Sequence, residues 1–254
     1  MKIILKMRKI GRIFPKPIKN LLAVPYRRLG SIARLDKILI KEIAEYFNLS
    51  EKETIWLFKS SERLGADLWH ILNPKTKEEI ENFYKTTPFY VFELAHWHML
   101  EFQREFRSEI IKLATGEILD FGAGIGDLCL ELARRKFNVD YADMPGITFN
   151  FAKWLFKKRG YNINMIDLNQ EKIAKKYDTI YCIDVIEHVL NPRKILEDFG
   201  AHLKKNGRLI ITNLKVSEIL ESHPMHMKID LDNEKFLNQL GLAKTNEPWL
   251  WIKS

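Results

Sequence analysis

A glycine-rich loop between two acidic residues is the clearest chemical feature of this sequence. The loop follows a short apolar stretch and contains Gly122, Gly124 and Gly126, with Asp120 before it and Asp127 after it. Glycines at the end of a strand let the backbone approach a ligand closely, whereas no Gly-Lys-Ser/Thr sequence follows, which excludes a P-loop. The flanking carboxylates would repel a dinucleotide pyrophosphate, but they attract the sulfonium and ammonium groups of S-adenosylmethionine. The alternative is a plain turn in an α/β protein.

One acidic residue also ends each of the next two predicted strands. Asp143 follows the stretch 138–142, and Asp167 follows the stretch 163–166. A carboxylate at the first position can accept hydrogen bonds from both ribose hydroxyls, as in other nucleotide-binding folds. Asp167 is placed for the amino group of adenine. Its alternative role is to cap a turn or helix, which strand-end aspartates often do.

Alternating strands and helices must position these residues. Strands are predicted at 117–121, 138–142, 163–166, 179–183, 208–212 and 249–252, and helices at 127–135, 147–159 and 192–203. Such alternation predicts a parallel sheet with helices on both faces, which binds its ligand beyond the carboxyl ends of the strands. Residues 32–115 show helical spacing instead, with predicted capping boxes that start at Ser50 and Thr76.

From Gly116 to the C-terminus the sequence resembles class I S-adenosylmethionine-dependent methyltransferases. The resemblance rests on residues 117–126, Asp143, Asp167, and the runs 177–180, 184–188 and 203–207. It is strongest to the small-molecule branch that includes ubiquinone-biosynthesis O-methyltransferases, where an acid-x-x-Glu-His-Val run follows the fourth strand. The resemblance implies a Rossmann-like, doubly wound, mostly parallel seven-stranded sheet over 116–254. Residues 32–115 then form a helical cap that shapes the substrate site.

The same resemblance implies a set of cofactor contacts. We expect these from Asp120, Phe121, Gly122, Ala123, Gly124 and Gly126 for the methionine part, Asp143 and Met144 for the ribose, Asp167 and Leu168 for the adenine, and from Asp184 and Val185. The helix before the first strand is expected to close over the cofactor. That places Tyr90 and Trp97 beside the methyl group or an apolar substrate, although aromatic residues at this spacing also fit core packing.

The run 184–188 and a distal histidine supply the candidate catalytic groups. Methyl transfer to a hydroxyl requires alignment and removal of a proton, and His188 is the predicted base because its intrinsic pKa lies near neutrality. Glu187 and His188 can alternatively cap a helix beneath the pocket. His226 is expected to line the acceptor pocket. Together, Glu187, His188 and His226 are similar to a metal-binding pattern of small-RNA 3′-terminal 2′-O-methyltransferases, Glu-x-x-Glu-His with a distal His. The first Glu of that pattern is Asp184 in this sequence, and we expect no metal.

These features favour an enzyme that methylates a small, lipophilic acceptor, more readily on oxygen than on nitrogen or carbon. One alternative is an RNA methyltransferase that uses a basic N-terminal arm, and another is a non-catalytic subunit that binds S-adenosylmethionine. Cys129 and Cys182 lie far apart in apolar runs and are expected to be reduced thiols, which favours a cytoplasmic location. No apolar stretch approaches the roughly 20 residues that span a bilayer.

The positive charge is concentrated in the first residues. Residues 1–41 hold twelve Lys and Arg and one acidic residue, Asp36, while the whole chain carries +8, so the remaining chain is net negative. Residues 1–31 are predicted to form a basic amphipathic arm. It packs on the body, or contacts an anionic membrane surface, or, less favoured, binds nucleic acid.

Overall fold

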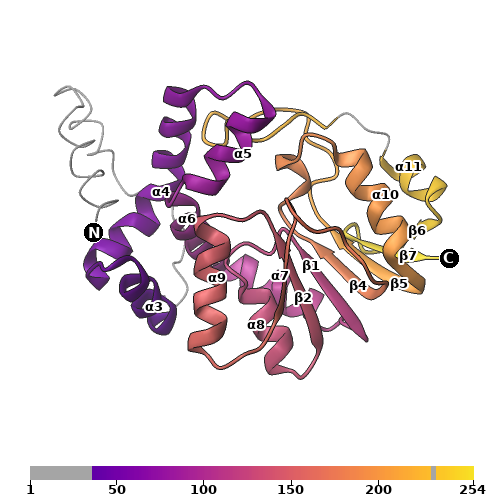
Figure 1. Cartoon of the computed structure of the whole chain (residues 1–254). Coiled ribbons are helices and arrows are strands. Elements are labelled where there is room, and N and C mark those ends of the chain that lie inside the picture. Colours follow the sequence, from indigo (N-terminus) through magenta and orange to yellow (C-terminus); the bar gives the residue numbers. More distant parts are fainter. Residues whose placement is uncertain (1–35, 230–232) are drawn as a thin grey trace.

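A single mixed sheet organises the computed structural model, which describes residues 36–229 and 233–254 (Figure 1). Its strand order is β3-β2-β1-β4-β5-β7-β6. The strands are β1 (Glu117–Phe121), β2 (Asn138–Asp143), β3 (Asn164–Asp167), β4 (Tyr177–Cys182), β5 (Leu203–Ile211), β6 (Leu242–Lys244) and β7 (Leu250–Lys253). The first five are parallel, and β7 is antiparallel to both of its neighbours. The predicted Rossmann-like, mostly parallel seven-stranded sheet is therefore confirmed.

Helices cover both faces of this sheet, because side chains along a strand point alternately to opposite sides. Ile118 of β1 belongs to the same buried cluster as α8 (Asp127–Arg134) and α9 (Ile147–Lys158). The next residue, Leu119, belongs to a second cluster with α10 (Pro192–His202) and α11 (Asn233–Gln239). The strand order reverses between β1 and β4, and their carboxyl ends open a crevice at this point.

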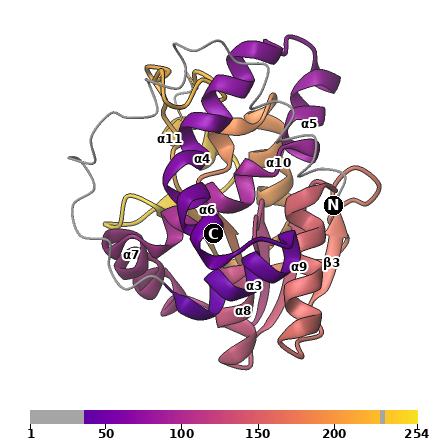
Figure 2. The same cartoon turned by 90° about the vertical axis from the view of Figure 1, so that its left-hand side faces the viewer.

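The region before β1 is helical, as predicted. It contains α3 (Lys37–Phe47), α4 (Glu51–Leu72), α5 (Lys77–Thr86), α6 (Phe89–Met99) and α7 (Glu101–Ile111). Both predicted capping boxes form, at Ser50 before α4 and at Thr76 before α5. The cap shares its core with the sheet, since Ile43 and Phe92 lie in one buried cluster with Phe151 of α9. Figure 2 shows α3, α4 and α6 on the side of the molecule that the cap covers.

The segment 212–229 leaves β5 and passes over the carboxyl ends of the strands, beside α5 (Figure 1). Two backbone contacts fix its path: Met227 N donates to Glu187 O at 2.8 Å, and Ile229 N donates to Val216 O at 3.1 Å. Among the described residues, no helix has both the length and the apolar character to cross a membrane. The predicted basic arm, residues 1–31, lies outside the described part of the chain.

Candidate active site

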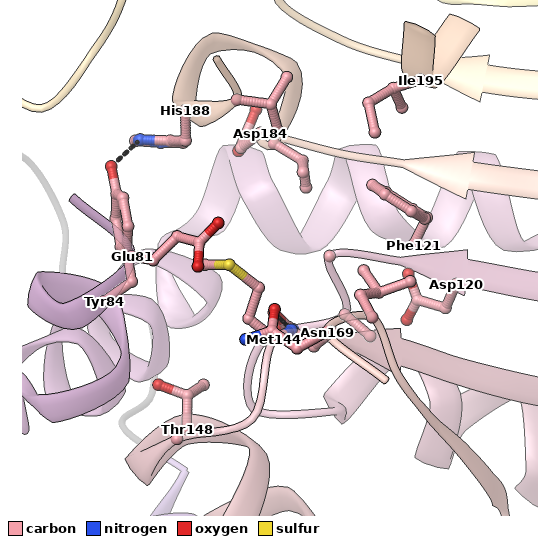
Figure 3. Close-up of a pocket in the computed structure, with 18 of the residues that line it drawn as sticks. Glu81, Tyr84, Asp120, Phe121, Met144, Thr148, Asn169, Asp184, His188 and Ile195 are labelled. Atoms are coloured by element: carbon pink, nitrogen blue, oxygen red, sulfur yellow. Dashed lines mark hydrogen bonds between the residues drawn. The ribbon is translucent and has the colours of Figure 1, made fainter. Parts of the chain in front are cut away.

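A cavity of about 730 Å³ lies at the crevice between β1 and β4, beneath the cap helices (Figure 3). Its sheet side is lined by predicted cofactor residues: Asp120, Phe121, Gly122, Ala123, Gly124, Asp143, Met144, Leu168, Asp184 and Val185. Its cap side is lined by α5 and α6 through Ile80, Glu81, Tyr84, Tyr90 and Leu94. The folded chain therefore brings the motif residues of the sheet and the side chains of the cap to one cavity.

The glycines of the loop have separate structural reasons. Gly122 has φ +69°, and a Cβ there would lie 2.4 Å from the Val185 side chain. Gly124 has φ +56°, and its Cβ would lie 2.9 Å from Leu94 of the cap. Gly126 does not line the cavity; a Cβ there would lie 2.4 Å from the ring of Phe156 in the core. Gly122 and Gly124 therefore let the loop lie close to Val185 and Leu94 at the wall of the cavity, whereas Gly126 packs against the core.

Asp143 ties the glycine loop to the end of β2. Its Oδ2 accepts a hydrogen bond from Gly124 N and its Oδ1 from Met144 N, both at 2.7 Å. Burial raises the pKa of this carboxyl to about 6, although the two backbone donors oppose the shift. Its remaining lone pairs can accept ribose hydroxyls, as predicted from the sequence.

Asp167 is used differently from the predicted adenine contact. Its Oδ1 accepts a hydrogen bond from Asn169 N at 2.9 Å, so the carboxylate caps its own turn. Leu168 and Asn169 line the cavity at this point, and Asp167 does not. The structure thus favours the capping alternative for Asp167.

The methionine end of the cavity contains a charge cluster that the sequence did not reveal. Asp127 Oδ2 lies 2.9 Å from His98 Nδ1, and Asp127 Oδ1 lies 3.2 Å from an Arg107 guanidinium nitrogen. Burial alone would raise the pKa of Asp127, but Arg107 and His98 outweigh it and hold that pKa well below its ordinary range. Asp127 therefore stays ionised and is paired with Arg107 and His98, which corrects the prediction that both flanking carboxylates face a cationic ligand.

Arg107 retains an unused donor in this cluster. Its Nη1 is buried and has no hydrogen-bond partner within the described chain, although Arg107 and His98 both line the cavity. A buried guanidinium donor without a partner is costly unless a ligand supplies an acceptor. Asp120 also lines the cavity, and burial raises its pKa to about 7 while the Cys129 thiol donates to its Oδ2 at 3.2 Å. Together they provide a cation for a carboxylate and a carboxyl for an ammonium group.

His188 lies on the opposite wall of the cavity, where Figure 3 shows its hydrogen bond to Tyr84 of the cap. Its Nδ1 is 3.0 Å from the Tyr84 hydroxyl, and its Nε2 is 3.5 Å from the Tyr90 hydroxyl. Burial, reinforced by the nearby His226 and His223, lowers the pKa of His188 to about 3, so the ring is neutral. Tyr90 lines the cavity as predicted, whereas Tyr84 was not identified, because nothing in the sequence relates α5 to a residue 104 positions later.

Glu187 and His226 lie behind His188 and do not line the cavity. The Glu187 side chain is buried, and burial raises its pKa to about 8. Asn213 donates to Glu187 Oε1, while Oε2 finds no partner among residues 36–229 and 233–254. The rings of His188 and His226 are 4.7 Å apart. The placement differs from the expectation that His226 lines the acceptor pocket, because its ring packs edge-on behind His188.

These three side chains form the one group in the described chain with metal-ligand geometry. Single ligand atoms of Glu187, His188 and His226 all lie within 4.8 Å of one another. Two imidazoles and a carboxylate with an unpartnered oxygen can hold a divalent cation. Asp184, which the metal interpretation also named, is not part of this group.

Asp184 instead connects the sheet to the cap. It has φ +55°, and its Oδ1 accepts hydrogen bonds from Thr212 Oγ1 at 2.9 Å and Asn213 Nδ2 at 3.0 Å. Its Oδ2 accepts from Trp97 Nε1 at 3.1 Å. Trp97 is 38% exposed and does not line the cavity. This corrects the expectation that Trp97 lies beside the methyl group: its indole bridges α6 to the end of β4.

Comparison with known proteins gives the following similarities. A family model described as a methyltransferase domain matches residues 95–243. Ubiquinone biosynthesis O-methyltransferase of Rickettsia conorii is 33% identical over 119 residues, which make up 46% of this chain and 41% of that protein. The protein of the same name from Rickettsia akari is 35% identical over 104 residues, or 40% and 41% of the two chains. The chain thus spans about two fifths of the length of these relatives.

Solved structures of low sequence identity are also similar. Phosphoethanolamine N-methyltransferase 2 of Haemonchus contortus, in complex with S-adenosyl-L-methionine, has a TM-score of 0.47 and 18% identity, with 54% of this chain and 36% of that chain covered. An S-adenosylmethionine-dependent methyltransferase of Clostridium acetobutylicum has a TM-score of 0.47 and 15% identity, with 63% and 96% covered.

Proposed function

Because this chain belongs to the family of methyltransferase domains, we propose that it transfers a methyl group from S-adenosylmethionine to an oxygen of a small, lipophilic acceptor. The observation that carries the proposal is the cavity itself, where Gly122–Gly124, Asp143 and the unpartnered Arg107 donor face the neutral imidazole of His188. Relatives named ubiquinone biosynthesis O-methyltransferase support oxygen as the methylated atom.

The described residues fit the cofactor at three places. Arg107 Nη1 and His98 suit the carboxylate of its amino-acid part, and Asp120 suits the ammonium group. Gly122 and Gly124 line the cavity without side chains, so the methionine chain would lie along their backbone. Asp143 would hold the ribose, and Leu168 with Asn169 would border the adenine. When bound, S-adenosylmethionine supplies a methyl group activated by its sulfonium.

The wall of the cavity supports the choice of acceptor. Ile80 of the cap, with Leu190 just before α10 and Ile195 within it, provides apolar surface, while Tyr84, Tyr90 and His188 provide polar atoms at one end. Such a surface suits an acceptor with an apolar body and a hydroxyl group. In the proposed transfer, the acceptor oxygen would bond to the methyl carbon as the bond from that carbon to the sulfonium sulfur breaks, S-adenosylhomocysteine would leave, and His188 would take the hydroxyl proton. An imidazole of low basicity suffices, because an oxygen that is gaining a methyl group becomes strongly acidic.

We also propose a role for residues 1–31, which lie outside the described chain. This arm contains nine Lys and Arg and no acidic residue, so it suits peripheral contact with an anionic membrane surface. Such contact would bring the cavity near lipophilic acceptors.

The enzyme activity is tested by methyl incorporation. The full chain is incubated with tritiated S-adenosylmethionine and an extract of small metabolites and lipids, with heat-inactivated protein as control. We expect label in a hydroxyl-bearing compound that partitions into organic solvent. Binding of S-adenosylmethionine without label in any acceptor would favour a non-catalytic subunit, and label in RNA would favour a nucleic-acid substrate.

The role of His188 is tested by its substitution. The His188→Ala variant should bind S-adenosylhomocysteine normally but lose about 10² to 10⁴ in turnover, the usual contribution of a positioned base. Treatment with a chelator distinguishes a metal ligand from a general base. If the chelator abolishes activity, added divalent ions restore it, and His226→Ala loses as much activity as His188→Ala, then His188 and His226 bind a cation. A His188→Gln variant with nearly full activity and a lower melting temperature would reduce His188 to a packing residue.

A further inference from the structure

Tyr84 connects the candidate base to the segment that passes over the active site. It lies on the cavity-facing side of α5, where its hydroxyl is 3.0 Å from His188 Nδ1 and 3.4 Å from the carbonyl oxygen of Met225. The Tyr84 ring also contacts Tyr90 edge-on, with centroids 5.5 Å apart. One hydroxyl therefore has two partners, the His188 ring and the backbone of the segment 212–229.

The Tyr84 hydroxyl has a single proton, and this selects one arrangement of the hydrogen bonds that link Met225, Tyr84 and His188. The Met225 carbonyl can only accept a hydrogen bond, so the Tyr84 hydroxyl satisfies it by donating its single proton. The Tyr84 oxygen is then left to accept a proton from His188 Nδ1. Both contacts are satisfied together only when the neutral imidazole carries its proton on Nδ1. In the opposite tautomer, Tyr84 donates to Nδ1 and the Met225 carbonyl loses this donor.

The consequence appears on the other ring nitrogen. With the proton on Nδ1, His188 Nε2 keeps a free lone pair, which is the atom that accepts a proton from a substrate. Its hydroxyl neighbour, Tyr90, lies 3.5 Å away, about as far as Tyr84 lies from the Met225 oxygen, and both contacts are long for hydrogen bonds.

We propose that Tyr84 is the positioning residue of His188: it holds the Nδ1 proton and turns the Nε2 lone pair toward the acceptor. This inference rests on the proposed function of His188 as the base. Tyr84 performs no chemistry itself, because burial raises its own pKa far above the physiological range and it remains a neutral hydroxyl.

The segment 212–229 contributes to the orientation of His188. Met225 supplies the carbonyl that orients the Tyr84 proton, Met227 N donates to Glu187 O at 2.8 Å, and the His226 ring packs against His188. The Nδ1-protonated tautomer of His188 is therefore favoured only while the segment 212–229 holds the Met225 carbonyl against the Tyr84 hydroxyl.

The test compares Tyr84→Phe with a matched control in the full chain. Tyr181→Phe is the control, since the Tyr181 hydroxyl also donates to a backbone carbonyl, that of Ile110 at 2.9 Å, in the core and outside the cavity lining. The tautomer of His188 is read from long-range ¹H–¹⁵N spectra of histidine-labelled protein saturated with S-adenosylhomocysteine, with the signal assigned by His188→Gln. Turnover is measured with the best acceptor of the methyl-incorporation screen.

We expect Tyr84→Phe to shift His188 toward the Nε2-protonated tautomer and to lower kcat about tenfold or more, with little change in KM. Tyr181→Phe should lower the melting temperature without changing the tautomer or kcat. An unchanged tautomer in Tyr84→Phe would overturn the proposal, as would a higher KM at constant kcat, which would make Tyr84 an acceptor contact. The spectra need no acceptor, so a full activity of His188→Ala would contradict the base without deciding the role of Tyr84.

Discussion

At the scale of single residues, two strand-end aspartates use their carboxylates in opposite ways. Asp143 faces the cavity with lone pairs to spare, and Asp167 caps its own turn. Hydrogen bonds to a charged group contribute about 1.5–3 kcal/mol. We therefore expect Asp143→Asn to weaken binding of S-adenosylhomocysteine about 10- to 100-fold and Asp167→Asn to change it little, as measured by titration calorimetry. Equal losses in both variants would show that Asp167 also contacts the cofactor.

The ionisation of Asp143 gives a second residue-scale prediction, which concerns pH. Burial raises its pKa to about 6, so the carboxyl is protonated below that pH and is then a poorer acceptor for ribose hydroxyls. The affinity for S-adenosylhomocysteine should fall as the pH is lowered from 7 to 5, with the steepest change near 6. Asp143→Asn should lose this part of the profile. Asp120, whose pKa burial raises to about 7, should keep its own part in the variant. A wild-type affinity that is flat from pH 5 to 7 contradicts the role of Asp143.

Some site residues were predictable from the sequence and others were not, for a physical reason. Gly122, Gly124 and Asp143 follow strands, where a local pattern places them at the sheet edge. Arg107 and Tyr84 lie on cap helices, and their roles depend on how those helices pack against residues far along the chain. Arginines and tyrosines on amphipathic helices are common, so no local signal separates these two from ordinary surface and packing residues.

At the scale of secondary-structure elements, the glycine loop contributes both to core packing and to the cavity wall, and single substitutions can separate these two roles. A Cβ at Gly126 meets Phe156 in the core, whereas a Cβ at Gly124 meets Leu94 of the cap beside the cavity. Each non-glycine residue at positive φ costs about 1–2 kcal/mol.

We expect Gly126→Ala to lower the melting temperature by several degrees, at roughly 2–4 °C per kcal/mol for a domain of this size. Gly124→Ala should lose more affinity for S-adenosylhomocysteine relative to its change in melting temperature. The two quantities are measured by calorimetry on the same preparations. A loss of affinity in Gly126→Ala that exceeds the loss in Gly124→Ala would contradict this division.

The predicted elements differ from the observed ones where tertiary packing decides. The aromatic run from Phe89 to Phe106 forms two helices, because Leu100 is extended at φ −64° and ψ 142° and separates α6 from α7. The break lets Trp97 reach Asp184 and Arg107 reach Asp127. The short edge strand β6 (Leu242–Lys244) was missed, because three residues with one buried side chain show no periodicity.

At the scale of the whole molecule, the uneven distribution of charge along the sequence supports the proposed membrane contact. The first 31 residues hold nine cations and no acid, whereas the whole chain carries +8, so the rest of the molecule is close to neutral. A Lys or Arg near an anionic leaflet contributes about 1 kcal/mol, and this attraction decays within a Debye length, about 8 Å at physiological salt. The proposed arm therefore has enough charge for reversible attachment, and the attachment should depend on salt.

The prediction at this scale compares the full chain, a form without residues 1–31, and a full-length form whose nine Lys and Arg in that range are replaced by Gln. Sedimentation with anionic and with neutral liposomes measures membrane binding, and calorimetry with S-adenosylhomocysteine measures the site. The full chain should bind anionic liposomes and release them at high salt, while both altered forms should lose this binding and keep the cofactor affinity. The Gln form separates charge from apolar insertion: if it still binds liposomes, apolar side chains of the arm carry the attachment. If all three forms sediment alike, the arm packs on the body, and the acceptor must reach the cavity through water.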